Sequence, residues 1–353
     1  MTCKRQTGFS LLETMVALTI LLAVGGIVGA GMVQMMKTQG TIANRTEMHT
    51  SVRSATELME QEIGQAGHIT LGSPNGGITL ASTVAGGSSA FTLNYPANTA
   101  VPNVYTGEVL TVDAANGLGT SVQETVTLTA GSTNTGTATF TNSHPAGAPV
   151  FALGAFATGV VPPDTSALTD PNGQCVPTSV TVGGVPQTYV GFSNPGPGAG
   201  IGSTCEILKL YGDINGDGNI VYIEYNCVQG TQASPGFLYR QQVNFGGAKT
   251  SPPPASAILL ANVLPNPNDV SGNKVPCFRY QVQPLGTGWV VTDVAVTLTV
   301  QTQNVDPVTH LPQTETKALL NVSPRNVFEV WVTANQVDPT RAQPMPGWIS
   351  SLL

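Results

Sequence analysis

Hydrophobic and polar positions divide the chain into a helical N-terminal part and a β-rich remainder. Residues 15–33 are an almost unbroken apolar run, long enough as a helix, at about 1.5 Å per residue, to cross the hydrocarbon core of a bilayer. Beyond it, apolar positions recur every three or four residues between charged ones at Met48, Val52, Ala55, Met59 and Ile63. This spacing predicts an amphipathic helix. We therefore expect one continuous helix over residues 9–66, half of it a membrane span at 15–33 and half of it a packing surface.

Residues 67–353 alternate apolar and polar positions in short runs between clusters of Gly, Pro, Asn and Ser. Such alternation between turn residues is typical of antiparallel strands. The pattern predicts strands at 91–95, 109–113, 124–128, 206–211, 220–225, 236–242, 257–263, 278–282, 294–300 and 326–332. The predicted fold class is α+β, a long N-terminal helix packed on one large antiparallel β-rich globular head with long loops.

Charged side chains are sparse and give no sign of an active site. They make up 9% of the chain, with a net charge of −7, against roughly a quarter of residues in an average soluble domain. The sequence offers no basic patch for a phosphate backbone, so we expect no nucleic-acid partner. The four histidines show no metal-binding spacing, and no nucleophile motif is present. We expect a protein that is not an enzyme.

The cysteines predict an oxidising compartment. Cys3 precedes the apolar run, and four more follow within the β-rich part: Cys175, Cys205, Cys227 and Cys277. An even number in an exported domain favours disulfides. Sequential loops are short and favour Cys175–Cys205 with Cys227–Cys277, although all three connectivities remain open. Zinc is the alternative, but the chain has no Cys-x2-Cys spacing.

A candidate calcium loop begins at Asp213. The run from Asp213 to Asn219, together with Glu224, fits the expression D-x-[DN]-x-[DN]-G-x5-E, which supplies the hard oxygen ligands of Ca2+. If the following segment is a strand, Glu224 lies about 16 Å beyond Asn219. We therefore expect Asp213, Asn215, Asp217 and the Asn219 carbonyl to be the ligands, with Glu224 a doubtful one. The alternative is an Asn/Gly-rich hairpin turn without an ion.

The residues ahead of the apolar run carry a second pattern. Gly8 is followed at once by Phe9, and the single acidic residue of the segment is Glu13. This arrangement resembles the class III signal of type IV prepilins and pseudopilins. The resemblance implies that a prepilin peptidase removes residues 1–8 and methylates the amine of Phe9. It also supplies a partner for Glu13, the Phe9 amine of the same or a neighbouring subunit, and a carboxylate at the edge of a membrane helix needs a partner.

Three further stretches resemble one branch of that family. The similarity is to minor pilins of the PilW type and the related pseudopilin GspJ, and it covers residues 53–67, the strand order over 204–245 and residues 323–330. The resemblance implies a structural minor pilin that helps prime or cap a type IV pilus at or near its tip, with an adhesive role. Its implied partners are the peptidase, the major pilin, other minor pilins and the inner-membrane assembly platform.

Location follows from the leader and the span. Lys4 and Arg5 precede the apolar run and place that end in the cytoplasm by the positive-inside rule. We expect a single-pass inner-membrane protein that moves to the pilus or cell surface on assembly. Two alternatives remain, a minor pseudopilin of a type II secretion system and a membrane-tethered adhesin or binding protein outside any filament.

Overall fold

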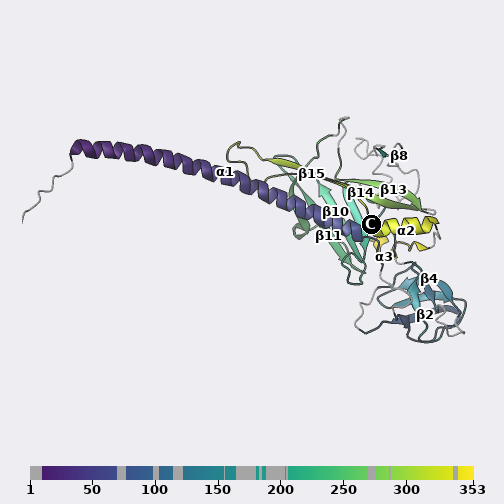
Figure 1. Cartoon of the computed structure of the whole chain (residues 1–353). Helices are drawn as coiled ribbons and strands as arrows, with labels where there is room; N and C mark the ends of the chain where they lie inside the picture. Colours follow the sequence, from purple (N-terminus) through teal and green to yellow (C-terminus); the bar gives the residue numbers. More distant parts are fainter. Residues whose placement is uncertain are drawn as a thin grey trace, which may run out of the picture.

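A computed structural model shows a long helix projecting from a β-rich head (Figure 1). It describes residues 10–69, 77–97, 103–113, 122–154, 156–163, 180–182, 185–187, 203, 206–268, 270, 275–285, 288–336 and 341–353. The α+β fold class predicted from the sequence is confirmed, with a long apolar N-terminal helix followed by a large antiparallel β-rich part.

Helix α1 spans Leu11–Gln65. All five positions of the predicted stripe, from Met48 to Ile63, are buried, whereas residues 10–39 are exposed. The helix ends where Gly67 adopts a φ of 86°, a left-handed conformation that favours glycine. A Cβ at that position would lie 2.6 Å from the Ala157 carbonyl oxygen. This turn therefore ends the helix and lets the chain pass close to the neighbouring backbone.

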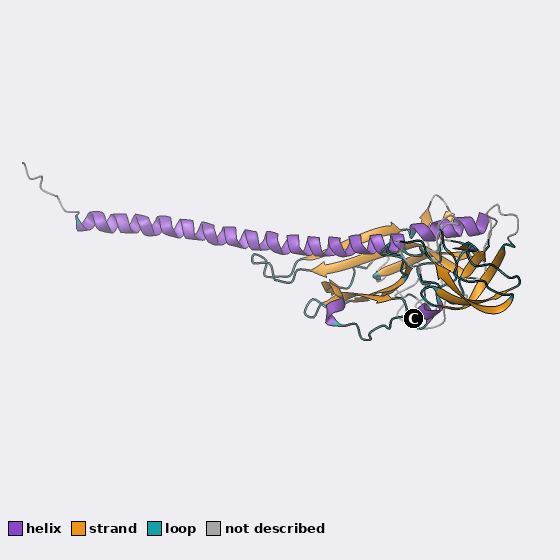
Figure 2. Ribbon diagram, turned by 90° about the horizontal axis from the view of Figure 1, so that it is seen from below, coloured by secondary structure: helices purple, strands orange, loops and turns teal. Residues whose placement is uncertain are grey.

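The C-terminal half of α1 lies along a seven-stranded antiparallel sheet (Figure 2). Its strands are β9 (Ile207–Gly212), β10 (Val221–Val228), β11 (Gly236–Asn244), β12 (Ile258–Leu264), β13 (Phe278–Leu285), β14 (Gly288–Gln301) and β15 (Thr314–Val322). They are ordered β13-β14-β12-β11-β10-β9, and β15 lies off this path, paired with β14. The short η2 (Ala255–Ala257) leads into β12. The buried stripe of α1 and the facing strand residues form the largest core cluster.

A second sheet is inserted between α1 and β9. Its six strands are β1 (Thr79–Leu80), β2 (Gly87–Asn94), β3 (Val109–Val112), β4 (Glu124–Gly131), β5 (Thr135–Phe140) and β6 (Val150–Ala152). Leu80 N–H donates to Ala148 O (2.9 Å) and Val150 N–H to Ile78 O (3.0 Å), which closes the sheet into a barrel with its own core. A separate hairpin pairs β7 (Val180–Val182) with β8 (Val185–Gln187). In Figure 1 the barrel, with β2 and β4, lies beyond the C-terminal end of α1.

The last residues of the chain join the barrel to the larger sheet. The side chain of Gln343 accepts from Val109 N–H and donates to Val109 O, both at 2.8 Å. Helix α3 (Gly347–Ser350) places Ile349 in a third core cluster with Tyr105 of the barrel side and Tyr211 of β9. In the described residues, the head, which we expected as one domain, thus has two large β units held together by a C-terminal segment, besides the β7–β8 hairpin.

The predicted strand at 326–332 is wrong, because these residues lie in helix α2 (Arg325–Gln336). Val and Phe suggested a strand, but a helix begins directly after Pro324, and the N–H of Phe328 bonds to the Pro324 carbonyl at 3.0 Å. Val327 and Ala334, two helical turns apart, are both buried. Tertiary packing against α1 and the sheet edge overrides the local β preference. The similarity of residues 323–330 to a closing pilin strand is lost with it.

Candidate functional site

The N-terminal end of α1 positions Glu13 at the start of the helix. Glu13 Oε2 accepts a hydrogen bond from Ser10 N–H at 3.2 Å, so the carboxylate satisfies a backbone donor that the helix leaves without an internal partner. The Ser-x-x-Glu spacing of residues 10–13 signals this contact in the sequence, although it was not among the predicted features. Gly8 and Phe9 lie outside the described residues, so their predicted cleavage stays a prediction.

The exposed half of α1 has the character of a membrane span. It contains a window of 18 residues that is apolar enough to cross a bilayer, and none of that window is buried within the chain. Apolar side chains there, such as Leu11, Ile27 and Met36, are 70–79% exposed. A helix surface this apolar requires lipid or other helices around it.

The candidate calcium loop is the turn between β9 and β10. Asp213 is buried, and its Oδ1 accepts the N–H of Asp217 at 3.0 Å. Asp217 Oδ1 accepts in turn from Asn219 N–H at 2.9 Å, and Asn215 is exposed. Gly218, at a φ of 88°, allows the sharp bend. The turn thus gathers the predicted oxygen donors on one short loop, and this donor chemistry fits a hard cation.

Glu224 belongs to a different group. It lies on β10 opposite Lys209 and Gln241, and its Oε2 accepts from Tyr222 Oη at 2.6 Å and from Lys249 Nζ at 3.0 Å. A strand position with two donors already in place does not suit a ligand of the turn. We therefore leave Glu224 out of the calcium site.

The structure joins Cys227 and Cys277 by a disulfide, which is the second of the two pairs that we favoured from the sequence. It links the end of β10 to the residue preceding β13. A carboxylate oxygen of Glu206 lies within 4.8 Å of both sulfurs, and burial raises the pKa of this carboxyl to about 7. Sulfurs in a disulfide are not thiolates, so this group is no metal centre in its oxidised form. Cys175 and Cys205 lie outside the described residues.

A buried imidazole in the barrel is a second feature that was not predicted from the sequence. His144 is fully buried, with Nδ1 3.4 Å from Asp113 Oδ2 and Nε2 3.2 Å from Glu124 Oε2. Glu124 also accepts hydrogen bonds from the N–H groups of Thr141 and Asn142. The three side chains are far apart in the sequence, so no spacing signals them. Because His144 has no access to solvent, this cluster is suited to holding the barrel together.

The barrel also contains a buried carboxyl near the junction. Glu108 is 1% exposed, and its Oε2 accepts the N–H of Tyr105 at 3.1 Å. Burial raises the pKa of Glu108 to about 8, even though the hydrogen bond from Tyr105 acts in the opposite direction. This group sits at the base of the barrel, on the side of the C-terminal segment.

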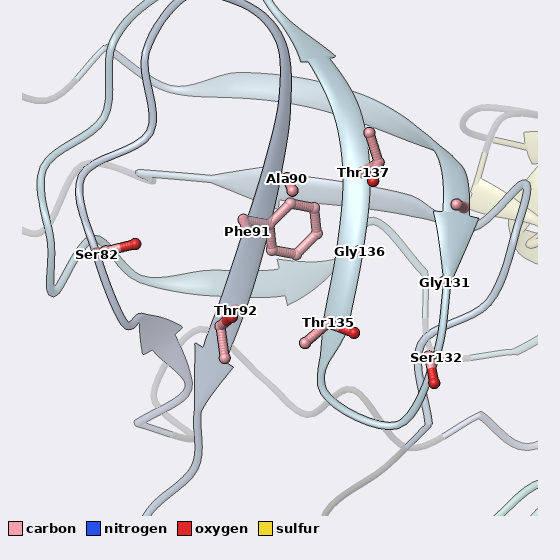
Figure 3. A pocket seen from close by; sticks show the side chains of 10 residues that line it. Ser82, Ala90, Phe91, Thr92, Gly131, Ser132, Thr135, Gly136 and Thr137 are labelled. Atoms are coloured by element: carbon pink, nitrogen blue, oxygen red, sulfur yellow. The ribbon is translucent and has the colours of Figure 1, made fainter.

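An open groove of about 310 Å³ lies in the barrel wall at β2, β4 and β5 (Figure 3). It is lined by Ser82, Ala90, Phe91, Thr92, Ala130, Gly131, Ser132, Thr135, Gly136 and Thr137. The Phe91 ring fills the space beside Gly136, where a Cβ would come within 2.7 Å of it. No ionisable side chain is among these lining residues, so the groove offers hydroxyls, backbone groups and a small apolar area to a neutral ligand.

Comparison with known proteins bears on the N-terminal segment. Residues 3–30 match the family model of the prokaryotic N-terminal methylation motif. The match supports a type IV pilin-like or pseudopilin protein. No curated protein and no solved structure gives a significant match to the chain.

The pilin-like signal agrees with the geometry of α1. It implies processing by a prepilin peptidase and a setting of pilus or secretion-system assembly. The exposed apolar half of α1 fits anchoring in the inner membrane before assembly. The β-rich head packed on the other half completes a pilin-like arrangement.

Proposed function

We propose that this chain is a structural, non-enzymatic minor pilin of the PilW type that helps prime or cap a type IV pilus. The observation that carries the proposal is the methylation motif at the start of a helix that is bare in its first half and covered by a head in its second. A helix of this kind requires lipid around its bare half before assembly and other helices afterwards.

The size of the head supports a place at or near the pilus tip. The barrel extends the head beyond the end of α1 (Figure 1), and a bulky extension at the tip does not interrupt the packing of the shaft. In this position the subunit contacts the major pilin and other minor pilins, after processing by the peptidase and release from the inner-membrane platform.

An adhesive role is the second part of the proposal, and the groove on the barrel supports it. The groove is uncharged and carries five Ser or Thr hydroxyls, which suits a neutral, hydroxyl-rich ligand such as a glycan. The change Thr137→Phe places a bulky ring in the groove and should abolish binding of purified full-length protein to a neutral glycan surface. The change Thr125→Phe, outside the groove lining, is the matched control. Equal binding by both variants would refute this part of the proposal.

The mature N-terminus tests the main proposal. Mass spectrometry of the protein from its own cells should find a methylated Phe9, and a Gly8→Glu variant should keep the leader. A normally matured and assembled Gly8 variant would refute the proposal. Deletion separates the pilus from the type II secretion alternative, since the first predicts loss of pili and the second predicts loss of secreted proteins. A tethered adhesin would give no cross-links to pilins.

A further inference from the structure

The loop between β14 and β15 contacts α1 where the covered half of the helix begins. We call this loop, residues 302–313, the β14–β15 tip. It projects along the helix toward the bare half (Figure 2). Within the described helix, Gly40 is the first residue that the head partly covers, and a Cβ on Gly40 would lie 3.0 Å from Pro307 Cγ. Arg45 Nε donates to Gln313 Oε1 at 2.5 Å. The tip is therefore fixed to α1 just past its bare half.

Helix geometry places the tip at the membrane surface. No charged residue occurs between Glu13 and Lys37, and residues 14–36 extend for about 34 Å as a helix, which matches a hydrocarbon core of roughly 30 Å. Gly40 lies only about 5 Å beyond Lys37 along the axis. This is the depth of the lipid headgroups, because these add roughly 5–7 Å on each side of the core.

The tip exposes three apolar side chains beside neutral polar ones and carries no exposed acid. Val305, Val308 and Leu311 are 54%, 54% and 66% exposed. The ionisable residues of the tip are His310 and Asp306, and Asp306 is buried. Its Oδ1 accepts the N–H groups of Val308 (2.7 Å) and Thr309 (2.9 Å). The Asp306 carboxylate thus holds the loop in a shape that presents its apolar side chains outward.

Two cationic side chains of α1 lie near these apolar side chains. Lys37 lies one helical turn before Gly40, and Arg45 is bonded to the tip itself. Both are exposed in a chain with few charges. Apolar side chains with flanking Lys or Arg are the pattern of protein surfaces that lie in the lipid headgroup layer, where cations meet anionic lipids.

We propose that the β14–β15 tip is a second membrane contact, which docks in the headgroup layer and fixes the depth and tilt of the head before assembly. This rests on the proposed anchoring by α1. The occupant is the lipid surface of the leaflet on the head's side. The competing occupant is the helix of a neighbouring pilin, which would cover the same side chains only within a filament.

Photo-crosslinking of the full-length protein in inner-membrane vesicles tests the proposal. A benzophenone side chain replaces Leu311, Ile20 in the bare half of α1, or Phe328. Phe328 is 49% exposed on α2. Its neighbour Asn326 donates to the Gln65 carbonyl at the end of α1, and Gln65 lies about 48 Å from Val33 along the helix. We expect lipid adducts at positions 20 and 311 and none at 328.

The three positions separate the possible failures. Lipid adducts at position 20 without any at 311 would overturn the docking of the tip while the anchoring stands. Adducts at 311 to another polypeptide in place of lipid would likewise overturn it, in favour of a subunit interface. The absence of lipid adducts at position 20 would overturn the anchoring and the tip proposal together.

A variant links the adduct to the apolar side chains. With the probe at Thr309, which is exposed on the same loop, replacing Val305, Val308 and Leu311 by Ser should lower the lipid-adduct yield by about fivefold. The yield from a probe at Ile20 in that triple variant should not change. An unchanged yield at Thr309 would contradict the proposal.

Discussion

The carboxylate of Glu62 on α1 and the guanidinium of Arg240 on β11 form a forked ion pair across the interface between helix and sheet. Arg240 Nε donates to Oε1 at 3.0 Å and to Oε2 at 3.2 Å, and Nη2 donates to Oε1 as well. Tyr225 Oη donates to Oε2. The pair ties the covered half of α1 to the head at the point where the helix approaches its end.

Replacing Arg240 with Ala should destabilise this interface strongly. Glu62 is 5% exposed, and a buried carboxylate that loses its charged partner costs about 3 kcal/mol of folding free energy. Thermal unfolding of the full-length protein in detergent measures the change. Arg53→Ala is the control, because Arg53 and Glu57 form an exposed pair on the same helix, and it should leave the melting temperature unchanged. Equal effects of the two changes would contradict this account.

The contribution of Glu108 to the free energy of unfolding should fall as the pH rises. Its pKa is about 8 in the folded barrel, against about 4.3 for an unfolded chain. The folded state therefore holds a proton that the unfolded state releases, so the contribution of this group is complete below about pH 4.3 and is lost as the pH rises through about 8. Glu108→Gln should raise the stability by about 1–3 kcal/mol at pH 8. The gain should vanish near pH 4.

Glu124 in the same barrel supplies the opposite case and serves as the control. Burial raises the pKa of Glu124, but hydrogen bonds from Thr141, Asn142 and His144 outweigh it and hold the pKa at about 2. The contribution of Glu124 is thus present above its unfolded value of about 4.3 and is lost as the pH falls toward 2. Glu124→Gln should lower the melting temperature at pH 7. Melting curves of both variants from pH 4 to 9 that shift in the same direction would refute the assignment.

Calcium is expected to bind the turn between β9 and β10, as proposed from the spacing of its oxygen donors. Adding Ca2+ to chelator-treated protein should raise the melting temperature, because an ion that binds only the folded state stabilises it. Asp217→Ala should remove the response. Glu224→Gln should retain it, since Glu224 bonds to Tyr222 and Lys249. If the chelator leaves the melting temperature of the wild type unchanged, the turn is a plain hairpin.

The sequence predicted the parts of the fold that local periodicity determines. The stripe from Met48 to Ile63 repeats with the helical period, and all five of its residues are buried. Most strands were predicted correctly because their apolar and polar positions alternate. Helix α2 was missed because Val327 and Phe328 prefer strands, whereas the burial of Val327 and Ala334 on one helix face depends on tertiary packing.

The polar clusters of the head could not be predicted, since their members are distant in the chain. Strand pairing brings His144 to Asp113 and Glu124, and the contact between α1 and β11 brings Arg240 to Glu62. The division of the head into two β units was hidden for a similar reason. The barrel closes through pairing of residues 78–80 with 148–150, and no local pattern records that contact. Local spacing was enough to favour the Cys227–Cys277 pair and to find the turn at Asp213, and it also contained the unread signal of the Glu13 cap.

Glu13 allows its two roles, capping and pairing, to be separated. Its carboxylate accepts the Ser10 N–H, and the proposed assembly mechanism also requires its negative charge to pair with the methylated amine of Phe9. Glu13→Gln keeps an acceptor for the cap and removes the charge, whereas Glu13→Ala removes both. If the charge serves assembly, both variants should be processed by the peptidase but fail to enter filaments, as scored by immunoblots of sheared pili. Assembly of the Gln variant at the wild-type level, with failure of the Ala variant, would show that Glu13 acts as a helix cap and not as the partner of an amine.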